Sequence, residues 1–258
     1  MQQNFFEHFG IKLDIEKVKK YLTRDNFAII DTKARIEKKY RDAIIKSWDN
    51  YIKMKDSINI EEFSITFCPP SYKYILENGV LKLSDEFCKK YQEASLYVYD
   101  SNIRFFENLN NDDFQYHLNK IVKRYRSFNN VIDLKKFKGI SGIYLMVLDN
   151  YKQIYVGQSK DVCKRIVQHW KNTPRFDKLI FPSIKKSNIN IDSFGALDTT
   201  RIYIKQIEKL HNLDLEEERI VEKIPQKYLI NRIGGGIKLE SDFDTFKVIN
   251  SINQRNLE

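Results

Sequence analysis

Hydrophobic and polar positions follow two different patterns along the chain. In the first half, apolar residues recur at helical intervals among many charged ones, which predicts helices over residues 14–22, 31–54, 83–99 and 112–128. Two consecutive prolines near residue 70 interrupt this pattern, because proline cannot continue a helix. Further along, the pattern changes to short β-like runs separated by turns. We therefore expect a mixed α+β or α/β protein, with a mostly helical domain over residues 1–135 and a small sheet-containing domain over residues 136–258.

A β-hairpin is predicted for residues 142–157, GIYLMVLDNYKQIYVG, because two runs of β-branched and aromatic residues flank the polar turn DNYK. If the loop has an even number of residues, Tyr144 lies opposite Gly157, and Tyr155 lies opposite Met146. Paired residues share a face of a sheet, so both tyrosines emerge on one side as diagonal neighbours. A one-residue bulge would instead place them on opposite faces. The glycine opposite Tyr144 is expected to leave open space there.

The rest of the second half alternates helices with a further strand. Residues 201–207 are predicted as a third strand, and residues 161–170 and 214–224 as helices, which together indicate a small three-stranded antiparallel sheet flanked by helices. On the first of these helices, Arg165 and His169 are four residues apart and border its apolar side. They either point toward the hairpin tyrosines or form an ordinary polar pair at the border of the core.

The second of these helices is acidic. Glu217 precedes Ile220 and Val221 by three and four residues, so it borders the buried side of the helix. A carboxylate there is suited to a hard divalent cation. The stretch from Asp214 to Glu217 is also a capping-box pattern, and acidic residues favour a helix N-terminus on electrostatic grounds. Asn231 follows shortly before a run of glycines.

Composition narrows the class of protein. The chain is 42% hydrophobic and 31% charged, which is typical of a globular protein. No apolar run approaches the roughly 18 residues that span a bilayer, and the first residues lack a signal-peptide pattern. The cysteines have neither the spacing of a zinc site nor that of a disulfide framework, which favours a reducing compartment. We expect a cytoplasmic protein that does not bind membranes.

The charge favours an anionic partner. Lys and Arg number 44 against 35 Asp and Glu, a formal charge of +9, and nucleic acid is the commonest partner of such proteins, although many basic proteins bind none. Residues 112–128 interleave cations with aromatic rings, a combination that binds phosphates and stacks on bases. The candidate nucleic-acid contacts are Lys123, Arg124 and Arg126 of this segment, and Lys160 further along. The alternative is a solvated basic face over aromatic core residues.

The order and spacing of these features resemble the GIY-YIG nuclease family. Its signature is two Gly/aliphatic/Tyr triplets, a helix with Arg and often His, a helix with Glu, and a later Asn. Here the triplets are residues 142–144, GIY, and 155–157, YVG, with valine in place of the second isoleucine. Arg165 follows the second tyrosine by ten residues, and His169 follows four residues later. The resemblance covers about residues 139–237 and does not extend into the first domain, residues 1–135, which is basic and could serve to recognise the DNA target.

The resemblance implies a metal-dependent endonuclease that hydrolyses phosphodiester bonds in DNA, of restriction type or associated with mobile elements, phage or defence. The site residues that it implies are Tyr144, Tyr155, Arg165, His169, Glu217 and Asn231. Glu217 would hold Mg²⁺ or Mn²⁺, with the adjacent Glu216 and Glu218 as alternatives. Competing interpretations are a GIY-YIG-like module that binds DNA or protein without catalysis, and a structural domain with a chance motif. The target sequence, RNA or branched substrates and the oligomeric state stay open.

The resemblance also implies a role for each residue. Arg165 would neutralise charge that develops on the phosphate, and Tyr144 would position or deprotonate the attacking water. A free phenol, with a pKa near 10, is a poor base at neutral pH and needs a cationic neighbour or the metal. Lys152, Lys160 and His169 are the candidate helpers. Tyr155 would orient the water or the phosphate, and Asn231 would support the site through hydrogen bonds.

Overall fold

The computed structural model describes residues 4–30, 35–36, 74–77, 80–125, 127–180, 188–207 and 213–231. The chain divides into two compact units. The first unit consists of residues 1–22, 101–173 and 190–258, and the second of residues 23–100 and 174–189. Among the described residues, no helix is both long enough and apolar enough to cross a membrane.

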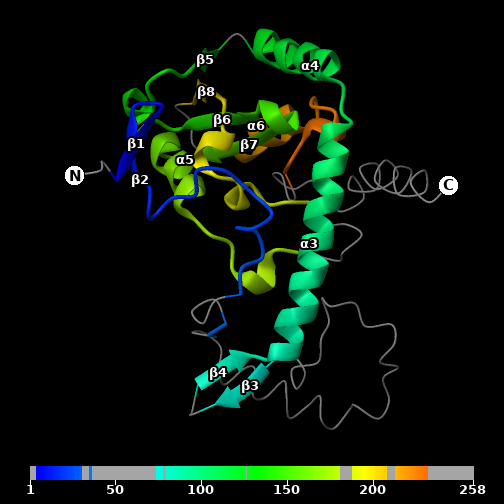
Figure 1. The fold of residues 1–258 in the computed structure, drawn as a ribbon. Coiled ribbons are helices and arrows are strands. Elements are labelled where there is room, and N and C mark those ends of the chain that lie inside the picture. Colours follow the sequence, from blue (N-terminus) through cyan, green and yellow to red (C-terminus); the bar gives the residue numbers. More distant parts are fainter. Residues whose placement is uncertain are drawn as a thin grey trace, which may run out of the picture. The chain divides into compact units, whose positions relative to one another are not determined.

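The first unit is built on a four-stranded antiparallel sheet in the order β5-β8-β6-β7 (Figure 1). The strands are β5 (Phe128–Asn130), β6 (Gly142–Leu148), β7 (Gln153–Ser159) and β8 (Arg201–Gln206). The three predicted strands are therefore present, and β5 adds a strand beside β8 that the sequence did not predict. Its three residues, FNN, are too short and too polar to give a strand pattern.

The hairpin of β6 and β7 has the predicted register. Tyr144 lies opposite Gly157, and Met146 lies opposite Tyr155. The turn has an even number of residues: Asp149–Tyr151 form a 3₁₀ turn, and Lys152 closes it with a left-handed φ of 52°. Both tyrosines therefore project from the same face of the sheet, as the pairing rule requires.

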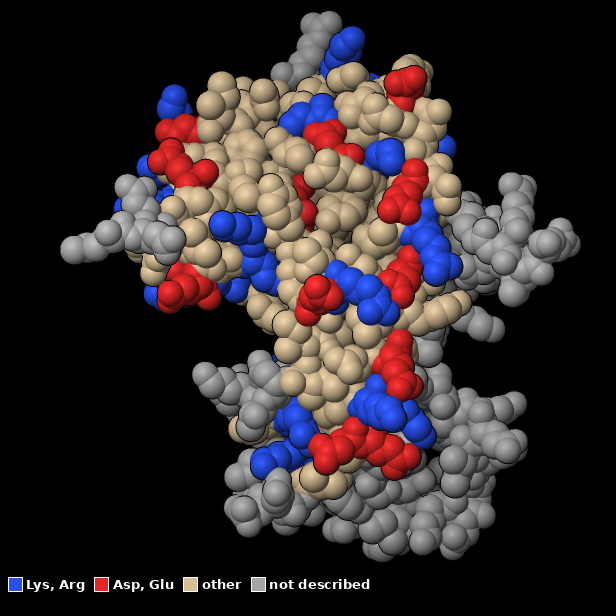
Figure 2. All heavy atoms as spheres, viewed as in Figure 1, with Lys and Arg blue, Asp and Glu red and all other residues tan. Residues whose placement is uncertain are grey.

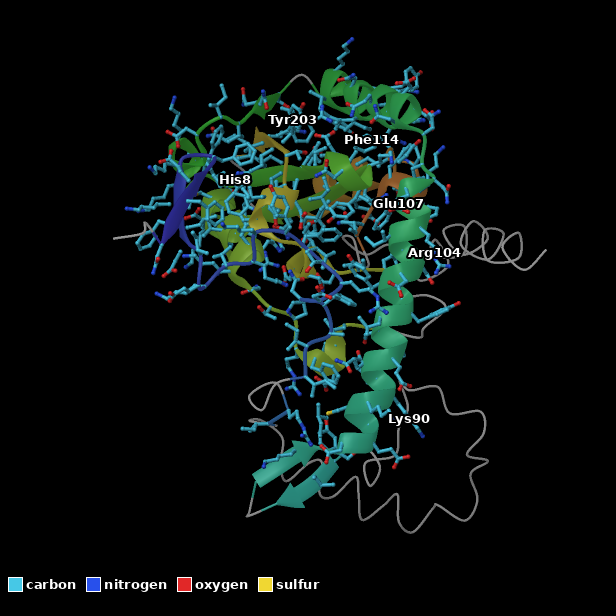
Figure 3. All side chains as sticks on the ribbon, in the orientation of Figure 1. His8, Lys90, Arg104, Glu107, Phe114 and Tyr203 are labelled. Atoms are coloured by element: carbon cyan, nitrogen blue, oxygen red, sulfur yellow. The ribbon has the colours of Figure 1, made fainter. Side chains whose placement is uncertain are left out.

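Helices cover both faces of this sheet. The helices α4 (Asn111–Arg124) and α6 (Leu213–Val221) share a hydrophobic core with the odd-numbered residues of β6, and Phe114 lies in that core (Figure 3). The helix α5 (Val162–Lys171) packs on β6 and β7, on the face of the even-numbered residues, which includes Tyr144. The helices predicted over 112–128, 161–170 and 214–224 are thus present with shifted ends.

The N-terminal residues form a hairpin of β1 (Phe5–His8) and β2 (Ile11–Asp14) instead of leading into a helix. The helix predicted over residues 14–22 is wrong. The Asp14 carboxylate accepts a hydrogen bond from the backbone N–H of Glu16, at 3.0 Å, which competes with helix formation. Further on, the carbonyls of residues 19 and 20 accept hydrogen bonds from residues 196 and 197, so tertiary pairing overrides the helical pattern.

The second unit contains the hairpin of β3 (Tyr74–Glu77) and β4 (Val80–Leu83). The helix α3 (Asp85–Glu107) begins in this unit and continues in the first one. It is longer than the helix predicted over residues 83–99.

Most of the helix predicted over residues 31–54 lies outside the described residues. Of the two described residues in that range, Ile36 forms an antiparallel bridge with Lys82.

The division between the two units differs from the boundary expected near residue 135. Both α4 and β5, which precede that boundary, belong to the unit that holds the four-stranded sheet. β5 pairs with β8 in the sheet, and α4 contributes Phe114, Leu118 and Ile121 to the core beneath it. Cationic and anionic side chains of the described residues are interspersed on the face shown in Figure 2.

Candidate active site

The two hairpin tyrosines lie together beneath α5, and their ring centroids are 6.2 Å apart. Tyr144 is fully buried and Tyr155 is half-buried. The ring of Tyr144 lies against Gly157, where any Cβ atom would collide with it. The space expected opposite Tyr144 is therefore filled by its own ring, and the glycine serves to admit that ring.

His169 joins the tyrosines from α5. This helix begins at Asp161, whose carboxylate caps it by accepting a hydrogen bond from the N–H of Lys164 at 2.9 Å. The imidazole of His169 is only 2% exposed, so it lies inside the core rather than at its border. Its Nε2 is 2.8 Å from the hydroxyl of Tyr144, and its ring meets that of Tyr155 edge to face at 5.1 Å.

A carboxylate that the sequence analysis missed completes this group. Asp192, in the 3₁₀ turn Ile191–Ser193, places Oδ1 2.5 Å from Nδ1 of His169. The imidazole thus connects a phenol on one side with a carboxylate on the other. No periodicity or motif marks Asp192, which follows His169 by 23 positions, so only the folded chain reveals this contact.

Arg165 is the cation shared by the acidic groups of the site. It is half-buried on α5, one turn before His169. Its charge acts to lower the pKa of Tyr144, Tyr155, Asp192 and Glu217. One guanidinium is therefore set among two phenols and two carboxylates that come from different elements.

Burial suppresses ionisation of both tyrosines. Burial raises the pKa of Tyr144 well above its usual value, and the nearby Tyr155 and Glu217 add to this effect, while Arg165 opposes it. Burial, followed by the charge of Glu217, raises the pKa of Tyr155 to about 12. Neither phenol therefore ionises by itself at neutral pH.

Glu217 is a buried carboxylate, 8% exposed. Burial, followed by the charge of Asp214, raises its pKa to about 7, and Arg165 opposes the shift. No hydrogen bond contributes to that pKa, and none to Glu217 is found within the described ranges. The charged form of Glu217 is thus poorly compensated in the protein alone.

The neighbouring glutamates are arranged differently. Glu216 forms ion pairs with Lys205 at 2.7 Å and with Arg219 at 2.8 Å, which lower its pKa. Glu218 is half-buried. Of the three, Glu217 is the one whose charge acts on the tyrosines.

A metal ion here would depend on few protein ligands. Within the part of the chain that the structure describes, no three His, Cys, Asp or Glu side chains form a group suited to hold a metal ion. Mg²⁺ is commonly bound through one or two carboxylates, with water and substrate phosphates completing its shell. The uncompensated oxygen ligand of Glu217 fits that mode of binding.

Asn231 supports the site from the edge of β7. Its side-chain amide donates to the carbonyl of Val156 at 2.7 Å, and its side-chain oxygen accepts from the N–H of the same residue at 2.9 Å. The preceding residue, Ile230, donates to the carbonyl of Ile154 at 3.0 Å. Asn231 thus fixes the backbone next to Tyr155 and does not join the buried ring cluster.

Of the predicted basic contacts, only Lys160 lies beside α5 within the described residues. Lys123 and Arg124 are exposed in the last turn of α4, the helix on the opposite face of the sheet, and Arg126 lies outside the described residues. Lys160 is exposed in the turn between β7 and α5. Lys152 donates to backbone carbonyls at the end of α3, so it is not positioned as a helper of the tyrosines.

A further group of lysines borders α5. The 3₁₀ turn Leu134–Phe137 packs on this helix, and the N–H of Val162 bonds the carbonyl of Ile140 at 3.0 Å. The exposed lysines of residues 134–138 and 160–164, here named the α5 lysine group, are Lys135, Lys136, Lys138, Lys160 and Lys164. The carboxylates of Asp133 and Asp161 in the same region serve as caps.

Comparisons of the chain with protein-family models, with curated proteins and with solved structures found no match. The chemistry of the site is therefore argued from the cluster of side chains. The cluster consists of Tyr144, Tyr155, Arg165, His169, Asp192 and Glu217, and it is called the tyrosine cluster below.

Proposed function

We propose that this protein is a metal-dependent endonuclease that hydrolyses phosphodiester bonds in DNA at the tyrosine cluster. The observation that carries the proposal is the convergence of two phenols, an imidazole, a guanidinium and an uncompensated carboxylate around the β6–β7 hairpin. Hydrolysis of a phosphodiester needs a cation beside the phosphate, a proton acceptor for the attacking water and a ligand for a metal ion. The order of these residues along the chain, which resembles the GIY-YIG signature, supports the same assignment.

Glu217 would hold the metal ion, Mg²⁺ or Mn²⁺. The bound metal would supply Lewis acidity that neutralises phosphate oxygens and stabilises the leaving O3′. Burial leaves Glu217 with a raised pKa of about 7, so a cation beside it removes an electrostatic penalty of the folded protein. This penalty supports Glu217, rather than the ion-paired Glu216, as the ligand.

Arg165 would bind the phosphate on which negative charge develops. Its guanidinium can donate two parallel hydrogen bonds to phosphate oxygens, which lysine cannot do. Because half-burial lowers the local dielectric constant, each of these hydrogen bonds is stronger than in water. Removal of such a contact costs on the order of 3 kcal/mol of transition-state stabilisation.

The tyrosines would orient the attacking water and receive its proton. Tyr155 is the more exposed of the two, so it meets the water first, while the buried Tyr144 connects it to His169. Asn231 holds the strand that carries Tyr155. Both phenols are protonated at neutral pH, so the site needs a further group that takes the proton.

DNA as the substrate is supported by charge. The chain carries a formal charge of +9, and the α5 lysine group borders the helix that bears Arg165 and His169. Cations around a phosphate-cleaving site attract the polyanionic backbone and orient it. Lys123 and Arg124 lie in α4, on the opposite face of the sheet from this helix.

The proposal is tested by incubating the protein with supercoiled plasmid and Mg²⁺ or Mn²⁺, with and without chelator. We expect nicked and linear products with metal and none with chelator. The matched control is Arg219→Ala, which removes a solvent-exposed arginine of α6, beside Arg165→Ala, which removes the one in the cluster. We expect the control to cleave and Arg165→Ala to be inactive, with DNA binding retained.

Two outcomes would contradict parts of the proposal. Full cleavage in excess chelator would remove the metal from the mechanism. Tight DNA binding without cleavage of any DNA, at any metal concentration, would replace the endonuclease with a binding module. Discrete fragments would further indicate a sequence-specific enzyme, and a smear a nonspecific one.

A further inference from the structure

His169 occupies the middle of a chain of hydrogen-bonding groups. On one side is the hydroxyl of Tyr144, 2.8 Å from Nε2, and on the other the carboxylate of Asp192, 2.5 Å from Nδ1. A second phenol lies on the Tyr144 side: the ring centroid of Tyr155 is 6.2 Å from that of Tyr144, and a hydrogen-bonding contact with Tyr144 acts to lower the pKa of Tyr155 against the larger effect of burial. Exposure decreases along this series, from the half-buried Tyr155 to the fully buried Tyr144 and His169.

The carboxylate of Asp192 sets the direction of proton transfer along these hydrogen-bonded groups. Burial acts to raise the pKa of Asp192, but the hydrogen bond from His169, with weaker contributions from Asn172 and Arg165, lowers it below the usual value. An ionised carboxylate can only accept, so Nδ1 of His169 carries the proton in this contact. In the neutral imidazole Nε2 is then an acceptor, and the hydroxyl of Tyr144 donates to it.

The tyrosines need such an acceptor. The pKa of Tyr144 lies well above 10 and that of Tyr155 is about 12, so neither can hold a negative charge while it takes a proton from water. A phenol avoids the charge if it releases its own proton as it receives another. The imidazole of His169 accepts that proton, and the positive charge that results forms beside Asp192.

The segment that follows Asp192 is held by the N-terminal segment of the same unit. The ammonium of Lys19 donates to the carbonyl of Ser193 at 2.9 Å, and the backbone carbonyl of Lys19 accepts from the N–H of Ala196 at 2.8 Å. The carboxylate of Asp198 accepts from the N–H groups of Leu22 and Gly195, both at 2.7 Å. These bonds fix the backbone beside Asp192, and a carboxylate on a fixed backbone can orient an imidazole.

We infer that Tyr155, Tyr144 and His169 form a proton relay that ends at Nε2 of His169, and that Asp192 is the positioning residue that makes His169 the final proton acceptor. This inference rests on the proposed nuclease function. It adds Asp192 to the site, and it assigns Tyr155 and Tyr144 to one pathway of proton transfer.

The step balances without an external oxidant or reductant. Water forms a bond to phosphorus as the bond from phosphorus to O3′ breaks, and the leaving O3′ takes a proton from solvent. The water proton passes to the Tyr155 hydroxyl, whose own proton passes to Tyr144, and that of Tyr144 passes to Nε2 of His169. Both phenols end neutral, and the imidazolium is paired with Asp192.

The direction of the proton relay is tested first on the free protein, without DNA or metal. The chain has four histidines, so the imidazole ¹⁵N signals of His169 are assigned by their loss in His169→Gln. We expect Nδ1 to be protonated and Nε2 to be an unprotonated acceptor in the neutral form. A neutral His169 with the proton on Nε2 would overturn the relay even if the protein cleaves DNA.

The role of Asp192 is tested by the pH dependence of cleavage. Asp192→Asn keeps the shape and an accepting oxygen but removes the charge beside the imidazolium. The titratable and charged groups that face His169 or Asp192 are Tyr144, Tyr155, Arg165 and Lys19, and all are left in place. We expect kcat to fall on the order of 100-fold. The acidic limb of the profile should move to lower pH, because the imidazolium loses its counter-charge.

The matched control is Asp161→Asn, which also removes one carboxylate, at the N-cap of α5, but does not touch His169 and keeps the helix cap. It should cleave at the wild-type rate with the wild-type pH profile. An Asp192→Asn rate equal to the wild type, or a lower rate with an unmoved acidic limb, would overturn the relay. A wild-type protein that cleaves no DNA would overturn the proposed function and this role with it, whereas the NMR result separates the two.

A double variant adds a second criterion. Members of one relay act as a unit, so their removal is not additive. We expect Tyr144→Phe/Asp192→Asn to be no slower than Tyr144→Phe alone. Multiplied rate losses would show that Asp192 acts apart from the tyrosines and would overturn the relay.

Discussion

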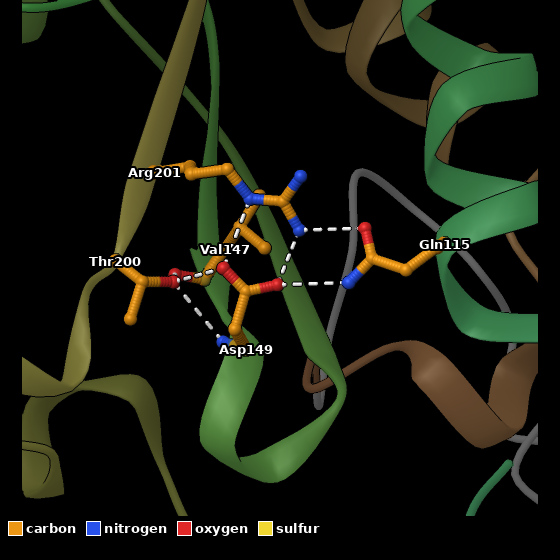
Figure 4. A network of polar contacts seen from close by, with 5 residues as sticks. All are labelled: Gln115, Val147, Asp149, Thr200 and Arg201. Carbon is orange, nitrogen blue, oxygen red and sulfur yellow. Dashed lines mark hydrogen bonds and ion pairs between the residues drawn. The ribbon is translucent and has the colours of Figure 1, made fainter. Parts of the chain in front are cut away.

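Two polar clusters on the same sheet each contain a carboxylate, and the pKa values of these two carboxylates are shifted in opposite directions. At the end of β6, Asp149 accepts hydrogen bonds from Arg201, from Thr200 at 2.5 Å and from Gln115 at 3.1 Å (Figure 4). Burial acts to raise the pKa of Asp149, but these contacts lower it below the usual value. In the tyrosine cluster, Glu217 is buried without such contacts, and its pKa rises to about 7.

The difference separates a structural network from a site prepared for a ligand. The Asp149 network joins α4, the hairpin turn and β8, and its charges and hydrogen bonds are matched within the protein. Among the described residues, the charges that act on the pKa of Glu217 are those of Asp214 and Arg165, so one cation faces two carboxylates there. Buried charge that the fold leaves unmatched lowers stability, and it persists where binding or catalysis uses it. Substitutions in the matched Asp149 network should therefore lower the stability of the protein. Substitutions in the unmatched tyrosine cluster should instead lower its activity.

The largest contrast is expected between two buried tyrosines. Tyr144→Phe should slow cleavage by about 100-fold or more, because it interrupts the path of the proton, and should cost about 1 kcal/mol of stability. Tyr228→Phe removes a hydroxyl that donates to Asp113 at 2.6 Å, and it should cost about 2 kcal/mol with an unchanged rate. Plasmid cleavage and urea unfolding measure the two effects. A folded Tyr144→Phe that cleaves at the wild-type rate would reduce this tyrosine to a packing residue.

Two arginines provide the next contrast. Arg165→Ala should lower kcat/KM by roughly 100-fold, since it removes the cation beside the phosphate, with little loss of stability. Arg201→Ala should unfold more easily by about 2 kcal/mol, because it leaves the charge of Asp149 without its main partner, while activity of the folded fraction persists. The reverse result, an inactive Arg201→Ala and an active Arg165→Ala, would exchange the roles of the two clusters.

The two carboxylates should also respond to pH with opposite sign. The folded pKa of Glu217 is raised above the usual 4.5, so its ionisation destabilises the fold increasingly as pH rises from about 4.5 through about 7. Without metal, Glu217→Gln should therefore be more stable than the wild type at pH 8, by on the order of 3 kcal/mol. The folded pKa of Asp149 is lowered below the usual 3.8, so its contribution is present above that pH and lost as pH falls.

Asp149→Asn should accordingly lose about 1 kcal/mol at pH 8 and match the wild type in strong acid. Thermal unfolding at several pH values, with and without Mn²⁺, measures both variants. Mn²⁺ should stabilise the wild type and leave Glu217→Gln unchanged. A Glu217→Gln protein less stable than the wild type at pH 8 would show that this carboxylate is matched by a partner.

The sequence predicted local pairing well and distant contacts poorly. Strand alternation and an even loop were sufficient to place Tyr144 opposite Gly157, because register in a hairpin is a local property. The helical spacing likewise placed Arg165 and His169 at the border of the apolar side of α5, and it left open whether they point toward the tyrosines. In contrast, Asp192 and the polar strand β5 have no local signature, and both are defined by contacts with distant segments. The helix expected over residues 14–22 was wrong for the same reason, since its backbone pairs with residues 196 and 197.

The smallest expected effect distinguishes two basic surfaces. Lys123 and Arg124 lie in the last turn of α4, where cations also offset the helix dipole, so a structural role explains them. Lys138 and Lys164 belong to the α5 lysine group, beside the helix of the tyrosine cluster. Removing one lysine that binds a phosphate lowers the slope of log affinity against log salt by about 0.9.

We therefore expect Lys138→Ala/Lys164→Ala to lower that slope by about 1.8 and Lys123→Ala/Arg124→Ala to leave it unchanged. Binding of the catalytically inactive Arg165→Ala background to a short duplex, titrated between about 50 and 200 mM salt, measures both pairs without cleavage. Because each ion pair with a phosphate is weak at high salt, the absolute decrease in affinity is modest and the slope is the more sensitive quantity. A lowered slope for the α4 pair alone would move the DNA to the opposite face of the sheet, away from the tyrosines, and would separate binding from the proposed site of cleavage.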